Sequence, residues 1–118
     1  MRTAALLAKG ISLNPCALPA GDALYMATRA GALSQGRADC GDIAEGFRAD
    51  FVILNTRRPS MTPCHSALSN LLYAAGGGDV EMTVADGRVL YHNGVFPTLD
   101  TERILYQAER CVRELLNR

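Results

Sequence analysis

A short, continuous apolar run at residues 51–54 (FVIL) constrains this chain more than any other feature. Its β-branched and aromatic residues, set between two polar ones, predict a strand that is buried on both faces. Residues 80–85 and 88–91 flank Asp86 and Gly87, which predict a type I′ hairpin because both central positions of that turn need positive φ. About three strands are close to the minimum for independent stability. We therefore expect the first strand to need neighbours that this chain does not supply.

Helices are predicted on both sides of these strands. Residues 1–9 predict a short helix that ends at Gly10, and a helix at the very first residue suggests that the natural sequence continues upstream. Residues 20–34 predict two short helices with a bend between them. Residues 66–75 predict a helix that is stopped by the glycines at 76–78.

The last helix has the clearest pattern, with Thr98 as its expected N-cap. Its apolar residues recur at helical spacing: Ile104, Leu105, Ala108, Cys111, Val112, Leu115 and Leu116. An apolar stripe of this kind has no use in water, so we expect it to pack on the chain's other helices.

Composition excludes several classes of function. The 118 residues are 48% hydrophobic and 20% charged, and twelve Lys and Arg balance twelve Asp and Glu, so a nucleic-acid or membrane-surface partner is not expected. No apolar run approaches the roughly 20 residues of a membrane span, and Lys9 interrupts a signal-like start. Four dispersed cysteines are typical of a cytoplasmic protein with reduced thiols, although an even count also allows two disulfides.

The residues that most often carry chemistry form no convincing site. Cys64, His65 and His92 could be imagined around a metal, but an adjacent Cys-His pair lacks ligand spacing. No nucleophile-elbow context surrounds Ser34, Ser60, Ser66 or Ser69. The glycines at 76–78 follow a helix instead of opening one, which is the wrong end for phosphate. Turn or capping roles are expected for the carboxylates Asp42, Glu45, Asp50, Asp79, Glu81 and Asp86.

Two motifs carry a family resemblance. Residues 41–54 (GDIAEGFRADFVIL) resemble the "G-x-(I/L)-x-x-G-(K/F)-x-A-D-(hydrophobic)" signature of amidohydrolases, and residues 84–89 (VADGRV) resemble the closing "V-x-D-G-(R/K)-V" hairpin. Residues 69–75, followed by Gly77 and residues 79–80, are similar to the deaminase and chlorohydrolase branch. The helical stretch 18–28 is similar to the helix after the last barrel strand of that branch.

The resemblance implies an α/β fold, here incomplete. It implies that residues 1–36 are the last helices of a (β/α)₈ TIM barrel and that residues 37–95 are C-terminal strands of a small β-sandwich with an inserted helix. Residues 96–118 would form a C-terminal helix. The implied relatives are deaminases acting on 5′-methylthioadenosine or S-adenosylhomocysteine.

The resemblance also implies where the chemistry lies. Family members hold zinc or iron with a His-x-His pair, two later histidines and an Asp, and the metal-activated water attacks the carbon that loses ammonia or chloride. All of these ligands would precede Met1, so no catalytic, cofactor-binding or metal residue is assigned here. The expected partner is the missing N-terminal barrel portion or a second copy, and a small-molecule substrate would bind only the complete enzyme. The alternative is a non-catalytic module that self-associates or complements a separate barrel chain.

Overall fold

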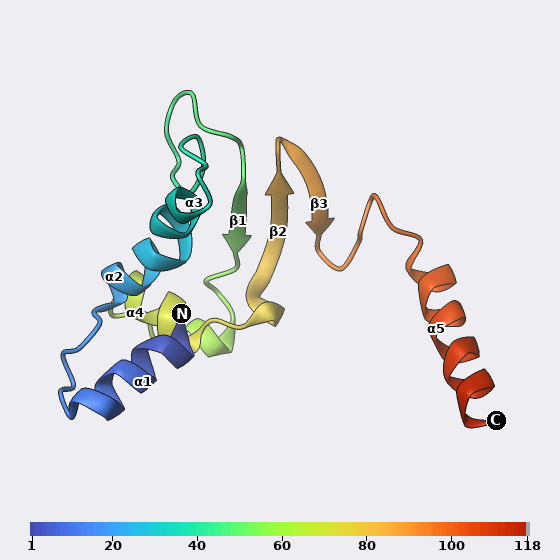
Figure 1. Ribbon diagram of the computed structural model, residues 1–118, viewed down its shortest axis with the longest axis horizontal. Helices are drawn as coiled ribbons and strands as arrows, with labels where there is room; N and C mark the ends of the chain where they lie inside the picture. Colours follow the sequence, from blue (N-terminus) through green and yellow to red (C-terminus); the bar gives the residue numbers. More distant parts are fainter. Residues whose placement is uncertain (118) are drawn as a thin grey trace.

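A computed structural model describes residues 1–117 as a layer of helices, a three-stranded sheet and a detached final helix (Figure 1). The helical layer contains α1 (Arg2–Ser12), α2 (Ala20–Tyr25), the π-helix η1 (Met26–Ala30), α3 (Gly31–Ser34), the 3₁₀-helix η2 (Pro59–Met61), α4 (Ala67–Ser69) and the π-helix η3 (Asn70–Ala74). The sheet contains β1 (Phe51–Leu54), β2 (Val80–Ala85) and β3 (Arg88–His92), with the 3₁₀-helix η4 (Gly77–Asp79) leading into β2. The chain ends with α5 (Thr101–Leu116).

The sheet is antiparallel, in the order β1-β2-β3. The predicted hairpin is confirmed, because Asp86 (φ 51°) and Gly87 (φ 74°) both take the positive φ that a type I′ turn requires. Strand β3 continues one residue beyond the prediction, so that His92 lies at the strand's end and pairs with Val95 across the following turn.

Strand β1 forms where the apolar run predicted it, and it lacks cover within this chain, as expected from the small number of strands. Phe51, Val52 and Ile53 are 36%, 54% and 43% exposed. The cause is that residues 1–117 contain a single sheet, without a second layer to cover it. Of the sheet residues only Val84 on the central strand is buried.

The main core lies in the helical layer and is small. Ala5 of α1, Ala23 of α2 and Leu72 of η3 are buried against one another, with Leu18 and Ala20 packed beside them. Small side chains let these short helices approach closely, which is why alanines dominate the contact. The Arg2 guanidinium ties α1 to the same layer by donating to the carbonyl of Ala75 at 2.8 Å.

Two helix boundaries differ from the sequence prediction. Helix α1 continues through Gly10 to Ser12 and ends where Leu13 takes a left-handed φ of 52°. An isolated glycine costs a helix only about 1 kcal/mol, so it does not force a stop. The expected bend in residues 20–34 is instead a π-helical turn in a continuous helix, where the Thr28 hydroxyl donates to the carbonyl of Leu24 at 2.8 Å.

The glycines at 76–78 also differ from a simple helix stop. Helix η3 ends at Ala74, and Gly77 and Gly78 enter the 3₁₀ turn of η4 together with Asp79. The serine that opens α4 behaves as an N-cap, since Ser66 Oγ accepts from the N–H of Ser69 at 3.3 Å.

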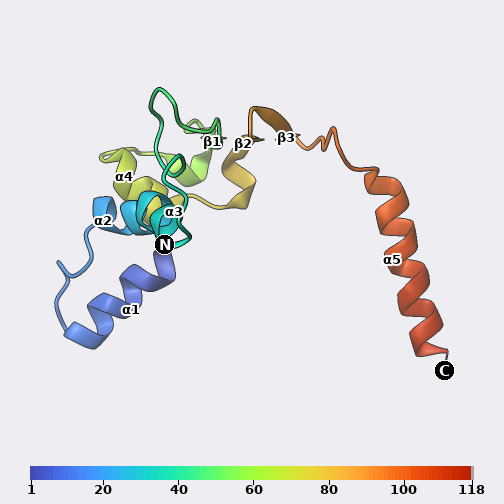
Figure 2. The same ribbon diagram turned by 45° about the horizontal axis from the view of Figure 1, so that its top comes forward.

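Helix α5 forms as predicted, but the prediction that it packs on the other helices is wrong. Every residue from Thr101 to Leu116 is exposed, and the helix lies beyond the β3 edge of the sheet, away from α1–α4 (Figures 1 and 2). Its N-cap is Asp100 and not Thr98: the Asp100 carboxylate accepts from the N–H of Arg103 at 3.0 Å. The segment 93–100 directs α5 away from the sheet after Phe96 has packed on Tyr91, with 5.0 Å between ring centroids.

This arrangement leaves much more surface exposed than a closed domain of the same size. The accessible surface is 8862 Å², whereas a compact monomer of 12.7 kDa exposes about 6,200 Å². The radius of gyration is 18.4 Å, compared with about 13.5 Å for a compact domain of this length. The fold is therefore open along its sheet and along α5.

Candidate functional site

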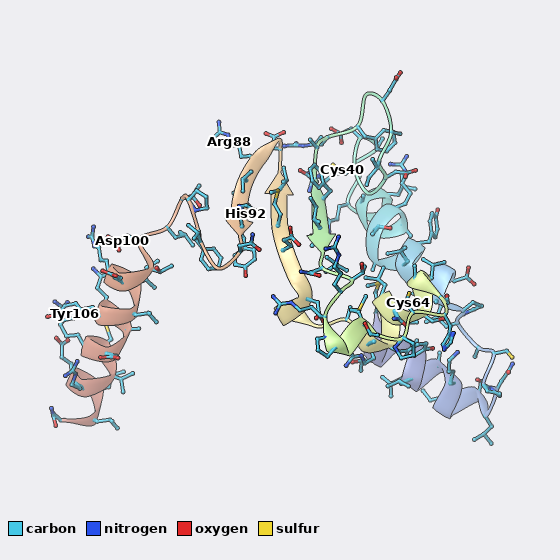
Figure 3. The ribbon with its side chains drawn as sticks, turned by 180° about the vertical axis from the view of Figure 1, so that it is seen from behind. Cys40, Cys64, Arg88, His92, Asp100 and Tyr106 are labelled. Atoms are coloured by element: carbon cyan, nitrogen blue, oxygen red, sulfur yellow. The ribbon has the colours of Figure 1, made fainter. Side chains whose placement is uncertain are left out.

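The three residues considered for a metal site do not meet. Cys64 and His65 are exposed in the loop between η2 and α4, while His92 lies at the end of β3 (Figure 3). The His92 ring contacts the side-chain amide of its neighbour Asn93, at 3.3 Å. No group of three His, Cys, Asp or Glu side chains within residues 1–117 is placed to hold a metal ion. The residues present therefore do not fit the zinc or iron centre that the resemblance implies.

The buried cysteine is a poor candidate for a reactive centre. All four are free thiols, and Cys16, Cys64 and Cys111 are exposed. Cys40 is buried, and this burial, together with its contact to the Asp39 carboxylate at 3.5 Å, raises the pKa of its thiol. A thiol with a raised pKa is mostly protonated at neutral pH and is a poor nucleophile. No disulfide joins the described cysteines.

A polar cluster joins the two family motifs. Asp50 stands at the start of β1 and Asp86 in the hairpin turn, and Asp50 Oδ1 accepts from the backbone N–H of Asp86 at 2.6 Å. Arg48 pairs with the Asp86 carboxylate at 2.9 Å, and that carboxylate raises the pKa of the guanidinium. Arg37 approaches the other oxygen of Asp50 at 3.7 Å. Each carboxylate is occupied by partners within the chain, which agrees with the structural role predicted for both.

The loop that precedes β1 is fastened to the helical layer by Arg29. Its guanidinium donates to the carbonyls of Ala38 and Cys40 at 2.8 and 2.7 Å. The same group lies 4.8 Å from the centre of the Phe47 ring, at cation–π distance. One side chain of η1 therefore contacts the loop at two places, residues 38–40 and Phe47.

Gly41 provides the closest approach between this loop and the helix. Its φ is +83°, and a Cβ placed on it would lie 2.7 Å from the carbonyl oxygen of Thr28 and from Cα of Arg29. Only glycine satisfies both the backbone angle and the contact. The first glycine of the family motif therefore has a specific packing role.

A second cluster surrounds Asp79, which is 7% exposed. Its carboxylate accepts from the Ser60 hydroxyl at 2.6 Å and from the N–H of Gly76 at 2.8 Å. These hydrogen bonds, with the Ser60 contact the strongest influence and Arg58 a weaker one, lower the pKa of Asp79. The N–H of Gly76 is therefore occupied by a carboxylate of the same chain and is not free for an external phosphate. Asp42 is not part of either cluster; its side chain accepts from the N–H of Ile43.

Sequence reasoning did not find the Asp79 and Arg29 contacts. Asp79 follows Gly76 by three residues, the spacing at which a side chain reaches back to cap a turn, and this was the available signal. Arg29 carries no comparable signal, because its partners are main-chain carbonyls whose position depends on the fold of the loop.

The remaining candidate is an interface. A groove of about 520 Å³ runs between the sheet and the segment before α5, and its lining is largely apolar. The lining residues are Gly77, Val80, Thr83, Leu90, Tyr91, Phe96, Thr98 and Leu99. Beyond it, α5 presents its apolar stripe to solvent. Within residues 1–117 no helix is long and apolar enough to cross a membrane.

The comparisons with known proteins identify the family. Residues 1–90 match the sequence profile of the amidohydrolase family. The chain therefore belongs to the amidohydrolase family, and the resemblance based on residues 41–54 and 84–89 is confirmed.

Deaminases are among the relatives of this chain. A 5-methylthioadenosine/S-adenosylhomocysteine deaminase of Dictyoglomus thermophilum is 38% identical to this chain. The alignment covers the whole of this chain and 28% of that deaminase. A 5′-deoxyadenosine deaminase of Methanothermobacter thermautotrophicus is 44% identical to this chain. That alignment covers 98% of this chain and 27% of the deaminase. The structure of this chain superposes with a TM-score of 0.92 on an adenosine deaminase of Xanthomonas campestris solved with bound zinc, at 31% identity, covering 99% of this chain and 27% of that one.

The extent of these matches has two consequences. The chain spans only about a quarter of the length of these relatives, so that it carries a portion of an amidohydrolase. Helix α5 lies beyond the family match, which ends at residue 90, yet within the 118 residues aligned with the deaminase of D. thermophilum. The superposition on the X. campestris structure covers 99% of this chain and therefore includes α5 in its detached position.

Proposed function

We propose that this chain is the C-terminal portion of a metal-dependent hydrolase that cleaves carbon–nitrogen bonds, deaminating a purine-like amino-heterocycle. Residues 1–36 supply the last helices of a TIM barrel, residues 37–95 supply strands of the small β-sandwich with an inserted helix, and residues 96–118 form the C-terminal helix. Residue 118 of that last segment lies outside the described residues.

The observation that carries the proposal is the uncovered surface of the fold. The excess over a closed domain is about 2,600 Å². A standard protein interface covers about 800 Å² on each partner, so a small contact does not close this fold. A large partner, such as the remaining three quarters of a deaminase chain, supplies enough cover for the sheet faces and for α5.

In this proposal the contacts around Arg29 and Asp50 have a structural role. Arg29 and Gly41 fix the loop between the helical layer and β1, and the Asp50–Asp86 hydrogen bond fixes the hairpin turn on the same loop. In the proposed complete enzyme, residues outside this chain would hold the zinc or iron, and the metal would activate a water molecule there.

A purine-like substrate is supported by the names of the relatives. Both curated relatives described above are deaminases of adenosine-type compounds. The free thiols suit a cytoplasmic location, which is part of the same proposal. The alternative, an interaction module without catalysis, gains no support from relatives of this kind.

A chimera tests the proposal. The segment of the D. thermophilum deaminase that aligns with this chain is replaced by residues 1–118, and ammonia release from S-adenosylhomocysteine and 5′-deoxyadenosine is measured. We expect a folded chimera that deaminates at least one of the two. A chimera carrying Gly41→Val is the matched control and is expected to lose activity together with solubility. A chimera that folds and holds its metal but deaminates neither compound would contradict the proposal.

A further inference from the structure

We draw no further inference here: the strongest candidate, the exposed apolar stripe of α5 together with the apolar groove between β3 and the segment 96–99, carries nothing because the structure does not show what covers it.

Discussion

Asp50 and Asp86 are joined by a hydrogen bond in which the Asp50 carboxylate accepts from the Asp86 backbone N–H at 2.6 Å. The two residues are 36 positions apart and belong to different family motifs. The contact fixes the position of the β2–β3 turn relative to the loop that enters β1. It explains in physical terms why an Asp stands at the start of β1.

The first prediction concerns this contact. Asp50→Ala should lower the free energy of unfolding by about 1.5–3 kcal/mol, because a backbone N–H loses a charged acceptor. Arg37→Ala removes only a longer, exposed ion pair and should cost about 1 kcal/mol or less. Urea unfolding followed by circular dichroism compares the two. Equal losses in both variants would show that the ion pair, and not the hydrogen bond, is the important contact.

The second prediction uses two glycines of the same loop. Gly41 and Gly46 have nearly the same φ, +83° and +81°, but only Gly41 is in close contact with the helix, and nothing lies within 4 Å of a Cβ on Gly46. Gly46→Ala should therefore cost about 1–2 kcal/mol from backbone strain alone. Gly41→Ala should cost clearly more, because the loop must also move off η1. The measurement is again the urea midpoint, and a Gly41→Ala loss no larger than that of Gly46→Ala would refute the close packing.

Much of the local structure could be predicted because it depends on neighbouring residues. The hairpin follows from the positive φ that Asp86 and Gly87 adopt, and β1 follows from its apolar β-favouring run. The end of α1 was harder to place, because Gly10 weakens a helix without stopping it. Thr98 and Asp100 are both good caps, and the choice of Asp100 depends on the path of the chain after Phe96.

The long-range packing could not be predicted in the same way. The stripe of α5 indicates that one face should be buried, but periodicity does not identify the surface that buries it. The assignment of that surface to the chain's own helices was therefore wrong. The missing cover of β1 could be anticipated, because the sequence offers too few strands to bury an apolar strand on both faces.

The third prediction concerns acid stability. Folding lowers the pKa of Asp79 below its ordinary value of 3.8, so the ionised carboxylate stabilises the fold above that value. The contribution is lost as the pH falls through the lowered pKa. Ser60→Ala removes the strongest cause of the shift and should reduce the difference between urea midpoints measured at about pH 6 and about pH 2.5.

Ser66→Ala is the matched control for the acid experiment. Its hydroxyl accepts from a neutral backbone N–H, so the variant should lose about 1 kcal/mol at both pH values. If Ser60→Ala behaved in the same way, with an unchanged dependence on pH, Asp79 would not be the group whose protonation destabilises the fold.

The fourth prediction compares two leucines. Leu72 is 2% exposed in the helical core, and Leu72→Ala should cost about 2–5 kcal/mol. Leu115 is 68% exposed on α5, and Leu115→Asp should change the stability of this chain by about 0.5 kcal/mol or less. The open apolar surface also predicts self-association of the wild type at micromolar concentrations, which sedimentation measures. A large loss of stability in dilute, monomeric Leu115→Asp would show that α5 packs on its own chain.

The central claim is that this chain has a structural role and that the ligands of the catalytic metal lie outside it. The metal content of the purified chain tests this claim. Catalytic zinc sites take about three protein ligands, and residues 1–117 do not bring three suitable side chains together. Elemental analysis of the purified chain, after dialysis against zinc and then against buffer, should therefore find far less than one zinc or iron per chain, with no deaminase activity. One tightly held metal per chain, lost in His65→Ala or His92→Ala, would contradict the account.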